Sequence, residues 1–166
     1  MVNMEPIPEE LVEETWQEVS SFASGRMIKE MGQVSKSQPE LLAFMMEFVQ
    51  DLDQEVKELA VYMFYVIFRM FQKSSRKRIK EISTESIIEC YEKNEDLIQS
   101  LEGIHQKFLD RIARIQLSSQ PYVMKYVVET LIDAPEEEDP VALTEEDTGF
   151  LFLLLKTVVD VLDKEV

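Results

Sequence analysis

The chain holds a single histidine, His105, three residues after Glu102, so a helix would carry both side chains on one face. Glutamate and histidine at this spacing are suited to binding a transition metal, but a two-metal site in a helical bundle needs a second such pair. One histidine cannot supply it. Glu102 and His105 are therefore candidates for a single-metal site completed by Glu13, Glu47 or Glu129. The alternative is a structural or solvated histidine, and we expect no bound metal or cofactor.

Glu47 and Glu129 are candidates for acid–base chemistry because they occupy equivalent positions in two similar segments. Such chemistry would require burial to raise the pKa of one carboxyl group. The helix pattern offers a simpler interpretation, since Glu47 lies on the polar edge of its helix and Lys125 precedes Glu129 by one turn. We expect both carboxylates at a solvated or partner-binding edge.

Other catalytic patterns are missing from the sequence. The only cysteine, Cys90, has no Cys-x-x-Cys partner, and the chain has no second histidine that could activate it. This predicts a buried thiol rather than a nucleophile. The acids at 136–139 and 145–147 lack the glycine and the alternation of a calcium-binding loop. No glycine-rich phosphate loop and no zinc spacing occurs. The sequence therefore predicts a protein that is not an enzyme.

An internal repeat is the clearest pattern in the chain. The segment SQPELLAFMMEFVQD at 37–51 reappears as SQPYVMKYVVETLID at 119–133, with five of the fifteen positions identical. The similarity extends over residues 37–73 and 119–164 if the second copy contains a nine-residue acidic insertion. Each copy predicts a helical hairpin, and repeat folds usually present surfaces for binding.

Apolar spacing predicts one all-α domain over residues 1–166, with about six or seven helices in a compact HEAT-like or bundle-like array. The first helix is expected at about 8–34, ending or breaking at Gly25 or Gly32. The next begins at Pro39, and a buried helix covers 59–71. Phe64 and its counterpart Leu155 are predicted core residues.

The second half of the chain begins with an irregular stretch, 74–94, in which Ser83 or Thr84 could start a short helix. Asn94 is expected to cap a longer amphipathic helix that reaches 115. Pro121 opens the second repeat copy, and Thr144 is expected to cap the last apolar helix, 150–162.

The first copy, from Leu41 to Phe68, resembles a HEAT repeat. The matching positions are an aspartate at the turn and a valine, a basic residue and an alanine in the second helix, here Asp51, Val56, Lys57 and Ala60. The second copy keeps Asp133 but has Thr148 and Leu151 where Lys57 and Ala60 stand. The resemblance implies an array of paired helices that binds other macromolecules.

The net charge of −16 disfavours binding to duplex nucleic acid or anionic membranes and favours a protein partner with a basic surface. One stretch opposes this trend and holds six of the seventeen basic residues: Arg69, Lys73, Arg76, Lys77, Arg78 and Lys80. Arg76, Lys77 and Arg78 are candidates for docking an acidic partner. The alternative is a solvated connection whose charges complement the C-terminus of the preceding helix.

These observations favour a non-enzymatic protein–protein interaction or adaptor module. Two alternatives stay open, namely a carboxylate-rich metal-binding protein or enzyme that uses Glu102 and His105, and an acidic decoy of a nucleic-acid-binding protein. A cytoplasmic location is expected because the chain opens without a secretory signal pattern and its longest apolar run is too short for a bilayer. A homo-oligomer is also compatible with the sequence.

Overall fold

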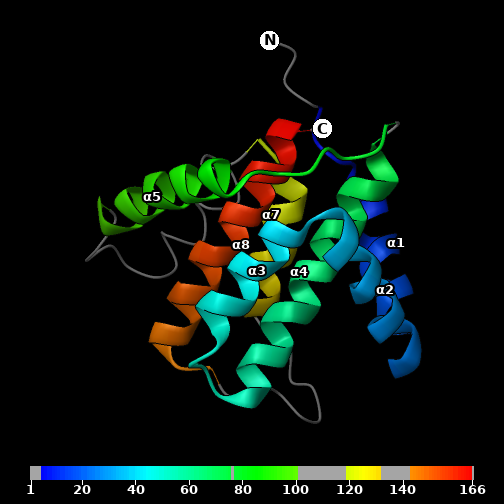
Figure 1. Cartoon of the computed structure of the whole chain (residues 1–166), viewed down its shortest axis with the longest axis horizontal. Helices are drawn as coiled ribbons and strands as arrows, with labels where there is room; N and C mark the ends of the chain where they lie inside the picture. Colours follow the sequence, from blue (N-terminus) through cyan, green and yellow to red (C-terminus); the bar gives the residue numbers. More distant parts are fainter. Residues whose placement is uncertain (1–4, 76, 101–118, 132–142, 166) are drawn as a thin grey trace.

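The computed structural model describes residues 5–75, 77–100, 119–131 and 143–165, which form seven α-helices and no strand (Figure 1). The helices are α1 (Glu9–Ser20), α2 (Ser24–Ser37), α3 (Pro39–Val49), α4 (Gln54–Ser74), α5 (Thr84–Ser100), α7 (Pro121–Leu131) and α8 (Glu145–Glu165). The prediction of an all-α array of about seven helices is confirmed. Within these ranges, no helix is long and apolar enough to cross a membrane.

Helices α4 and α8 form the centre of the molecule (Figure 1). Each has 21 residues, and they pack against each other. Helices α1 and α3 pack on α4, whereas α5 and α7 pack on α8. Two further contacts, α1 with α7 and α3 with α5, join the two groups. Phe64 and Leu155 are completely buried in this core, as predicted from their apolar surroundings.

Three helix starts follow local sequence signals. Pro39 and Pro121 each open a helix of 11 residues, because proline lacks the N–H that the first turn leaves unpaired. The backbone N–H of Asp147 donates to the hydroxyl of Thr144 over 3.0 Å, which confirms Thr144 as the cap of α8. Both sequence-matched segments thus begin with helices of equal length.

The prediction of one first helix over 8–34 is wrong, because the helix is interrupted between Ser20, the end of α1, and Ser24, the start of α2. Gly25 and Gly32 both lie inside α2 and cause no break. The hydroxyl of Ser21 donates to the carbonyl of Glu18 over 2.7 Å, and Ala23 has extended backbone angles of −67° and 153°. Side-chain bonds of this kind compete with helical ones, so the helix ends at the serines.

The predicted capping role of Asn94 is also wrong, because α5 continues through it to Ser100. Asn94 is buried, and its amide donates to Thr157 over 3.2 Å and to Asp160 over 3.1 Å, both on α8. The Asn94 side chain therefore binds polar groups of α8 and does not cap the start of a helix. The rest of the predicted helix, 101–115, lies outside the described residues.

Two buried glutamines anchor the extended segments that precede α5 and α1. Gln38 donates to the carbonyl of Lys80 over 2.8 Å and accepts from the backbone N–H of Ile82 over 2.9 Å. Gln120 accepts from the backbone N–H of Ile7 over 2.8 Å. Both glutamines are fully buried, so they satisfy backbone groups that water does not reach.

Candidate functional site

The structure describes only some of the residues that were predicted to do chemistry. Glu102 and His105 lie outside the described residues. Glu47 on α3 and Glu129 on α7 are both exposed. Across the described ranges, no three His, Cys, Asp or Glu side chains are grouped closely enough to hold a metal ion.

Lys125 lies one turn before Glu129, as in an ordinary surface ion pair, but the structure does not pair these two residues. Lys125 instead lies 3.2 Å from a carboxylate oxygen of Glu9 on α1. The physical reason is the packing of α1 on α7, which brings a second carboxylate close to the lysine. Glu129 is left as an exposed edge residue, in line with the simpler of its two interpretations.

Cys90 is buried at the contact of α5 with α8, as predicted. Burial raises the pKa of its thiol, and the nearby negative charge of Asp160 raises it further. A protonated, enclosed thiol is a poor nucleophile. Cys90 therefore serves the core.

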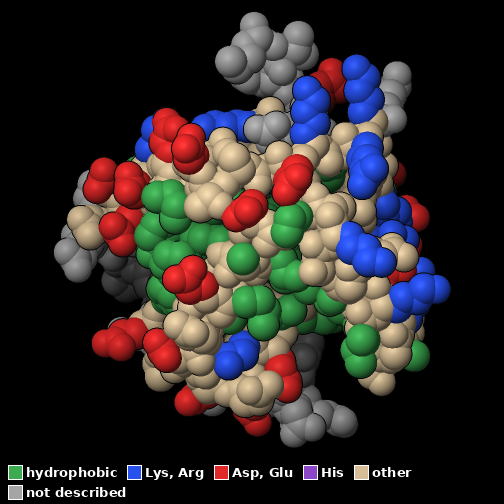
Figure 2. All heavy atoms as spheres, in the orientation of Figure 1, with side chains coloured by type: hydrophobic (Ala, Val, Ile, Leu, Met, Phe, Trp, Pro, Cys, Tyr) green, Lys and Arg blue, Asp and Glu red, His purple; other side chains and the backbone are tan. Residues whose placement is uncertain are grey.

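An apolar surface lies between α3, α5 and the start of α8, and Figure 2 shows hydrophobic side chains gathered there. We call it the aromatic face and define it by Phe44, Phe48, Ile88, Tyr91 and Phe150. The ring of Phe48 lies 4.7 Å from Phe44, 4.9 Å from Tyr91 and 6.4 Å from Phe150, between centroids. Phe48, Tyr91 and Phe150 are partly exposed, and Ile88 is 38% exposed.

Acidic side chains surround the aromatic face (Figure 2). The exposed acids include Glu40 and Glu47 on α3, Asp51 in the turn after α3, and Glu85 and Glu92 on α5. Burial raises the pKa of Tyr91, and the partly exposed carboxylate of Glu95 raises it further, so this hydroxyl stays protonated at neutral pH. The face therefore combines an aromatic centre with a negative rim.

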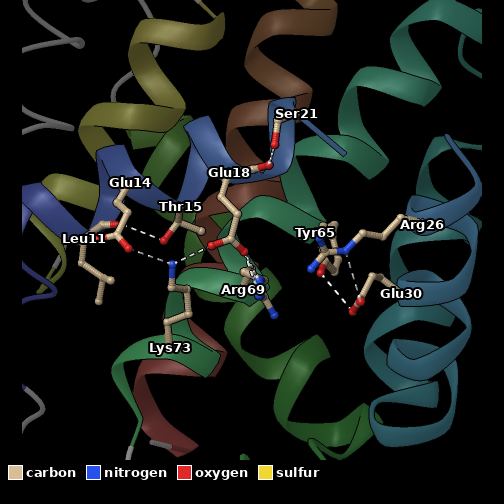
Figure 3. Close-up of polar contacts among 10 residues, drawn as sticks. All are labelled: Leu11, Glu14, Thr15, Glu18, Ser21, Arg26, Glu30, Tyr65, Arg69 and Lys73. Carbon is tan, nitrogen blue, oxygen red and sulfur yellow. Dashed lines mark hydrogen bonds and ion pairs between the residues drawn. The ribbon is translucent and has the colours of Figure 1, made fainter. Parts of the chain in front are cut away.

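A second polar region joins α1, α2 and α4 (Figure 3). Arg69 donates from two nitrogens to one oxygen of Glu18, over 2.9 and 2.7 Å, and Lys73 donates to the other oxygen over 3.0 Å. The hydrogen bonds from Lys73 and Arg69 lower the pKa of Glu18. On the α2 side, burial raises the pKa of Tyr65 to about 12, helped by Glu30. The Tyr65 hydroxyl therefore stays protonated and donates to Glu30 over 3.3 Å.

A pocket of about 290 Å³ opens beside this region, between α2, α4 and the connection after α4. It is lined by Glu30, Gln33, Val34, Lys36, Ser37, Tyr65, Gln72 and Arg78. Of the three basic candidates, Arg78 lines the pocket, Lys77 is exposed beside it in the chain, and Arg76 lies outside the described residues. Sequence reasoning missed the contribution of α2 because it merged this helix with α1.

A third polar cluster lies between α5 and α8. The ammonium group of Lys156 donates to Asn94 over 2.9 Å and to Asp160 over 2.7 Å, and only 5% of the lysine side chain is exposed. In the described chain, no buried side-chain nitrogen or oxygen lacks a hydrogen-bond partner. Because its groups bind one another inside the helix contact, this cluster joins two helices and offers no open site.

Comparison with protein-family models, with curated proteins and with solved structures gives no match. The described part is an all-helical array with an acidic, aromatic face on one side and a basic, pocketed face on another.

Proposed function

We propose that the protein is a non-enzymatic interaction module of helical-repeat type, whose aromatic face binds an amphipathic, basic helix of another protein. The observation that supports this proposal most directly is the partly exposed aromatic surface with a rim of carboxylates. Apolar surface that remains open to water favours a partner that covers it. A helix that lays an apolar stripe into such a surface is a common mode of recognition.

The rim selects among helices by charge. The exposed acids come from α3 (Glu40 and Glu47), from the turn after it (Asp51) and from α5 (Glu85 and Glu92), and the chain as a whole carries −16. A helix whose polar flanks carry lysine or arginine would meet opposite charges, whereas an acidic helix would be repelled. Attraction between exposed charges is screened over about 8–10 Å at physiological salt. Charge therefore speeds association, and the apolar contacts hold the complex.

The test uses a labelled synthetic helix with leucine and phenylalanine on one face and lysine on the other, measured by fluorescence anisotropy and stopped flow. Ile88→Glu places a charge on the aromatic face, one turn before Tyr91 on α5, and is expected to weaken binding by about tenfold or more. The matched control is Ile28→Glu, because Ile28 is 75% exposed on α2, away from that face. The control is expected to bind as the wild type does.

The association rate is expected to fall as salt rises, while the dissociation rate changes little. Duplex DNA of similar size is expected not to bind. Equal binding by both isoleucine variants, or tight binding of DNA, would contradict the proposal.

A further inference from the structure

The positive charges of the described chain are concentrated on one side. Figure 2 shows Lys and Arg side chains collected along the side where α2 and the end of α4 lie. We call this surface the basic face and define it by five exposed cations, Lys29, Lys36, Lys77, Arg78 and Lys80. In a chain with a net charge of −16, such a cluster creates a local potential opposite to that of its surroundings.

These five cations differ from several neighbouring cations in their pairing. Among the described residues, none of them forms an ion pair, although their neighbours do. Arg69 and Lys73 are both paired with Glu18, and Arg26 lies 3.9 Å from Glu30. The paired cations stabilise either the contact between α1 and α4 or helix α2 itself, whereas the five cations of the basic face are exposed and have no ion pair with another described residue.

Two of the unpaired cations, Lys36 and Arg78, line the pocket of about 290 Å³. Gln33, Ser37 and Gln72 add polar hydrogen-bonding groups to its walls. Glu30 is the only acid among the lining residues, and it already accepts from Tyr65 and faces Arg26. The pocket can therefore supply charged and neutral donors to a carboxylate.

The connection that carries Lys77, Arg78 and Lys80 is held in place by the core. Ile79 and Ile82 are buried, and Gln38 binds the backbone of Lys80 and Ile82. Cations on a fixed backbone lose less conformational freedom on binding than cations on a free loop. The basic face is in this respect prepared for a ligand.

We propose that the basic face binds a short acidic segment of a protein partner, with one Asp or Glu side chain in the pocket between Lys36 and Arg78. A single small anion would satisfy the pocket but leave Lys29, Lys77 and Lys80, which do not line it, without partners. A nucleic acid or a membrane extends beyond the patch and would meet the acidic remainder of the surface. A short run of carboxylates matches both the size and the sign of the face. This site is separate from the aromatic face. One molecule could therefore bind a basic helix on the aromatic face and an acidic segment on the basic face.

The test measures binding of a labelled ten-residue peptide of alternating Glu and Ser at low salt. Lys36→Gln with Arg78→Gln is expected to weaken binding by about tenfold or more. Lys57→Gln with Lys93→Gln is the matched control, because it removes the same charge from other parts of the surface. The control pair is expected to bind within about twofold of the wild type.

Competition experiments separate the ligand classes. Unlabelled Glu–Ser peptide is expected to displace the probe, whereas the Gln–Ser peptide, inorganic phosphate and vesicles of anionic lipid are expected not to. Failure of the acidic peptide to bind, equal loss in the two double variants, or stronger binding of a ten-nucleotide single strand would overturn the proposal. The Ile88→Glu substitution leaves the basic face unchanged. The effect of this substitution on binding of the basic helix therefore reports on the aromatic face alone.

Discussion

The contact of α1 with α4 and the contact of α5 with α8 both contain a polar cluster, but the two clusters differ in their access to water. In the first, the carboxylate of Glu18 binds Arg69 and Lys73 while 30% of its side chain is exposed. In the second, the ammonium group of Lys156 binds Asn94 and Asp160 while only 5% of its side chain is exposed.

This difference in burial indicates which cluster contributes more to the stability of the fold. A pair at the surface can exchange its partner for water, so its net contribution to the free energy of unfolding is small. A buried charge such as the ammonium group of Lys156 has no such exchange. Removing it leaves the buried oxygen of Asn94, and the carboxylate of Asp160 with 22% of its side chain exposed, without their cation. Similar hydrogen-bond lengths in the two clusters therefore conceal unequal importance.

The largest effect is expected from Lys156→Met. This change leaves Asn94 and Asp160 without their cation and should lower the free energy of unfolding by about 3 kcal/mol. Chemical denaturation monitored by circular dichroism measures it. Lys93→Met is the control, because Lys93 is an exposed lysine on α5. A loss below about 1 kcal/mol would show that the buried cluster is no more important than the exposed one.

Intermediate effects are expected from Gln38→Met and Gln120→Met, which keep the volume of the side chain but remove its hydrogen bonds. Each change leaves a buried backbone N–H unpaired, of Ile82 or of Ile7, and should cost about 1–3 kcal/mol. Hydrogen exchange of these two amides, followed by mass spectrometry, locates the loss. Each variant serves as the control for the other, and exchange that rises equally at both amides in both variants would contradict the assignment.

The smallest effect is expected from Glu18→Gln, which weakens three charge-assisted hydrogen bonds at a partly exposed site. A cost of about 1 kcal/mol at neutral pH is expected in denaturation experiments. Because the pKa of Glu18 is lowered in the folded protein, its contribution is complete above the usual value of 4.5. It is lost as the pH falls through the lowered pKa. The difference between wild type and variant should therefore shrink below about pH 4.5, and a constant difference would contradict this account.

Much of the fold could be predicted because its signals are local. Pro39, Pro121 and Thr144 mark helix starts by their own chemistry, and Phe64 and Leu155 lie in runs apolar enough to require burial. The capping prediction for Asn94 failed because its partners on α8 are more than sixty positions away in the chain.

The candidate surfaces were harder to predict for the same reason. The aromatic face joins residues of three helices, and the pocket joins Lys36 to Arg78 only because α2 is a separate helix. The charge cluster at 69–80 was visible in the sequence, but its division into paired and unpaired cations depends on Glu18 from α1. Local spacing contains no information about such contacts.

The hydrogen bond between Ile7 and Gln120 has a consequence for the synthesis of the protein. The two residues are 113 positions apart, so the ribosome must continue as far as Gln120 before α1 and the segment in front of it can be anchored on α7. Until then, Ile7, Val12 and Val19 lack part of the surface that buries them. A nascent chain in this state exposes apolar side chains and is the kind of species that molecular chaperones bind. Synthesis of Gln120 thus determines when the segment that contains Ile7 can reach its final position in the growing polypeptide.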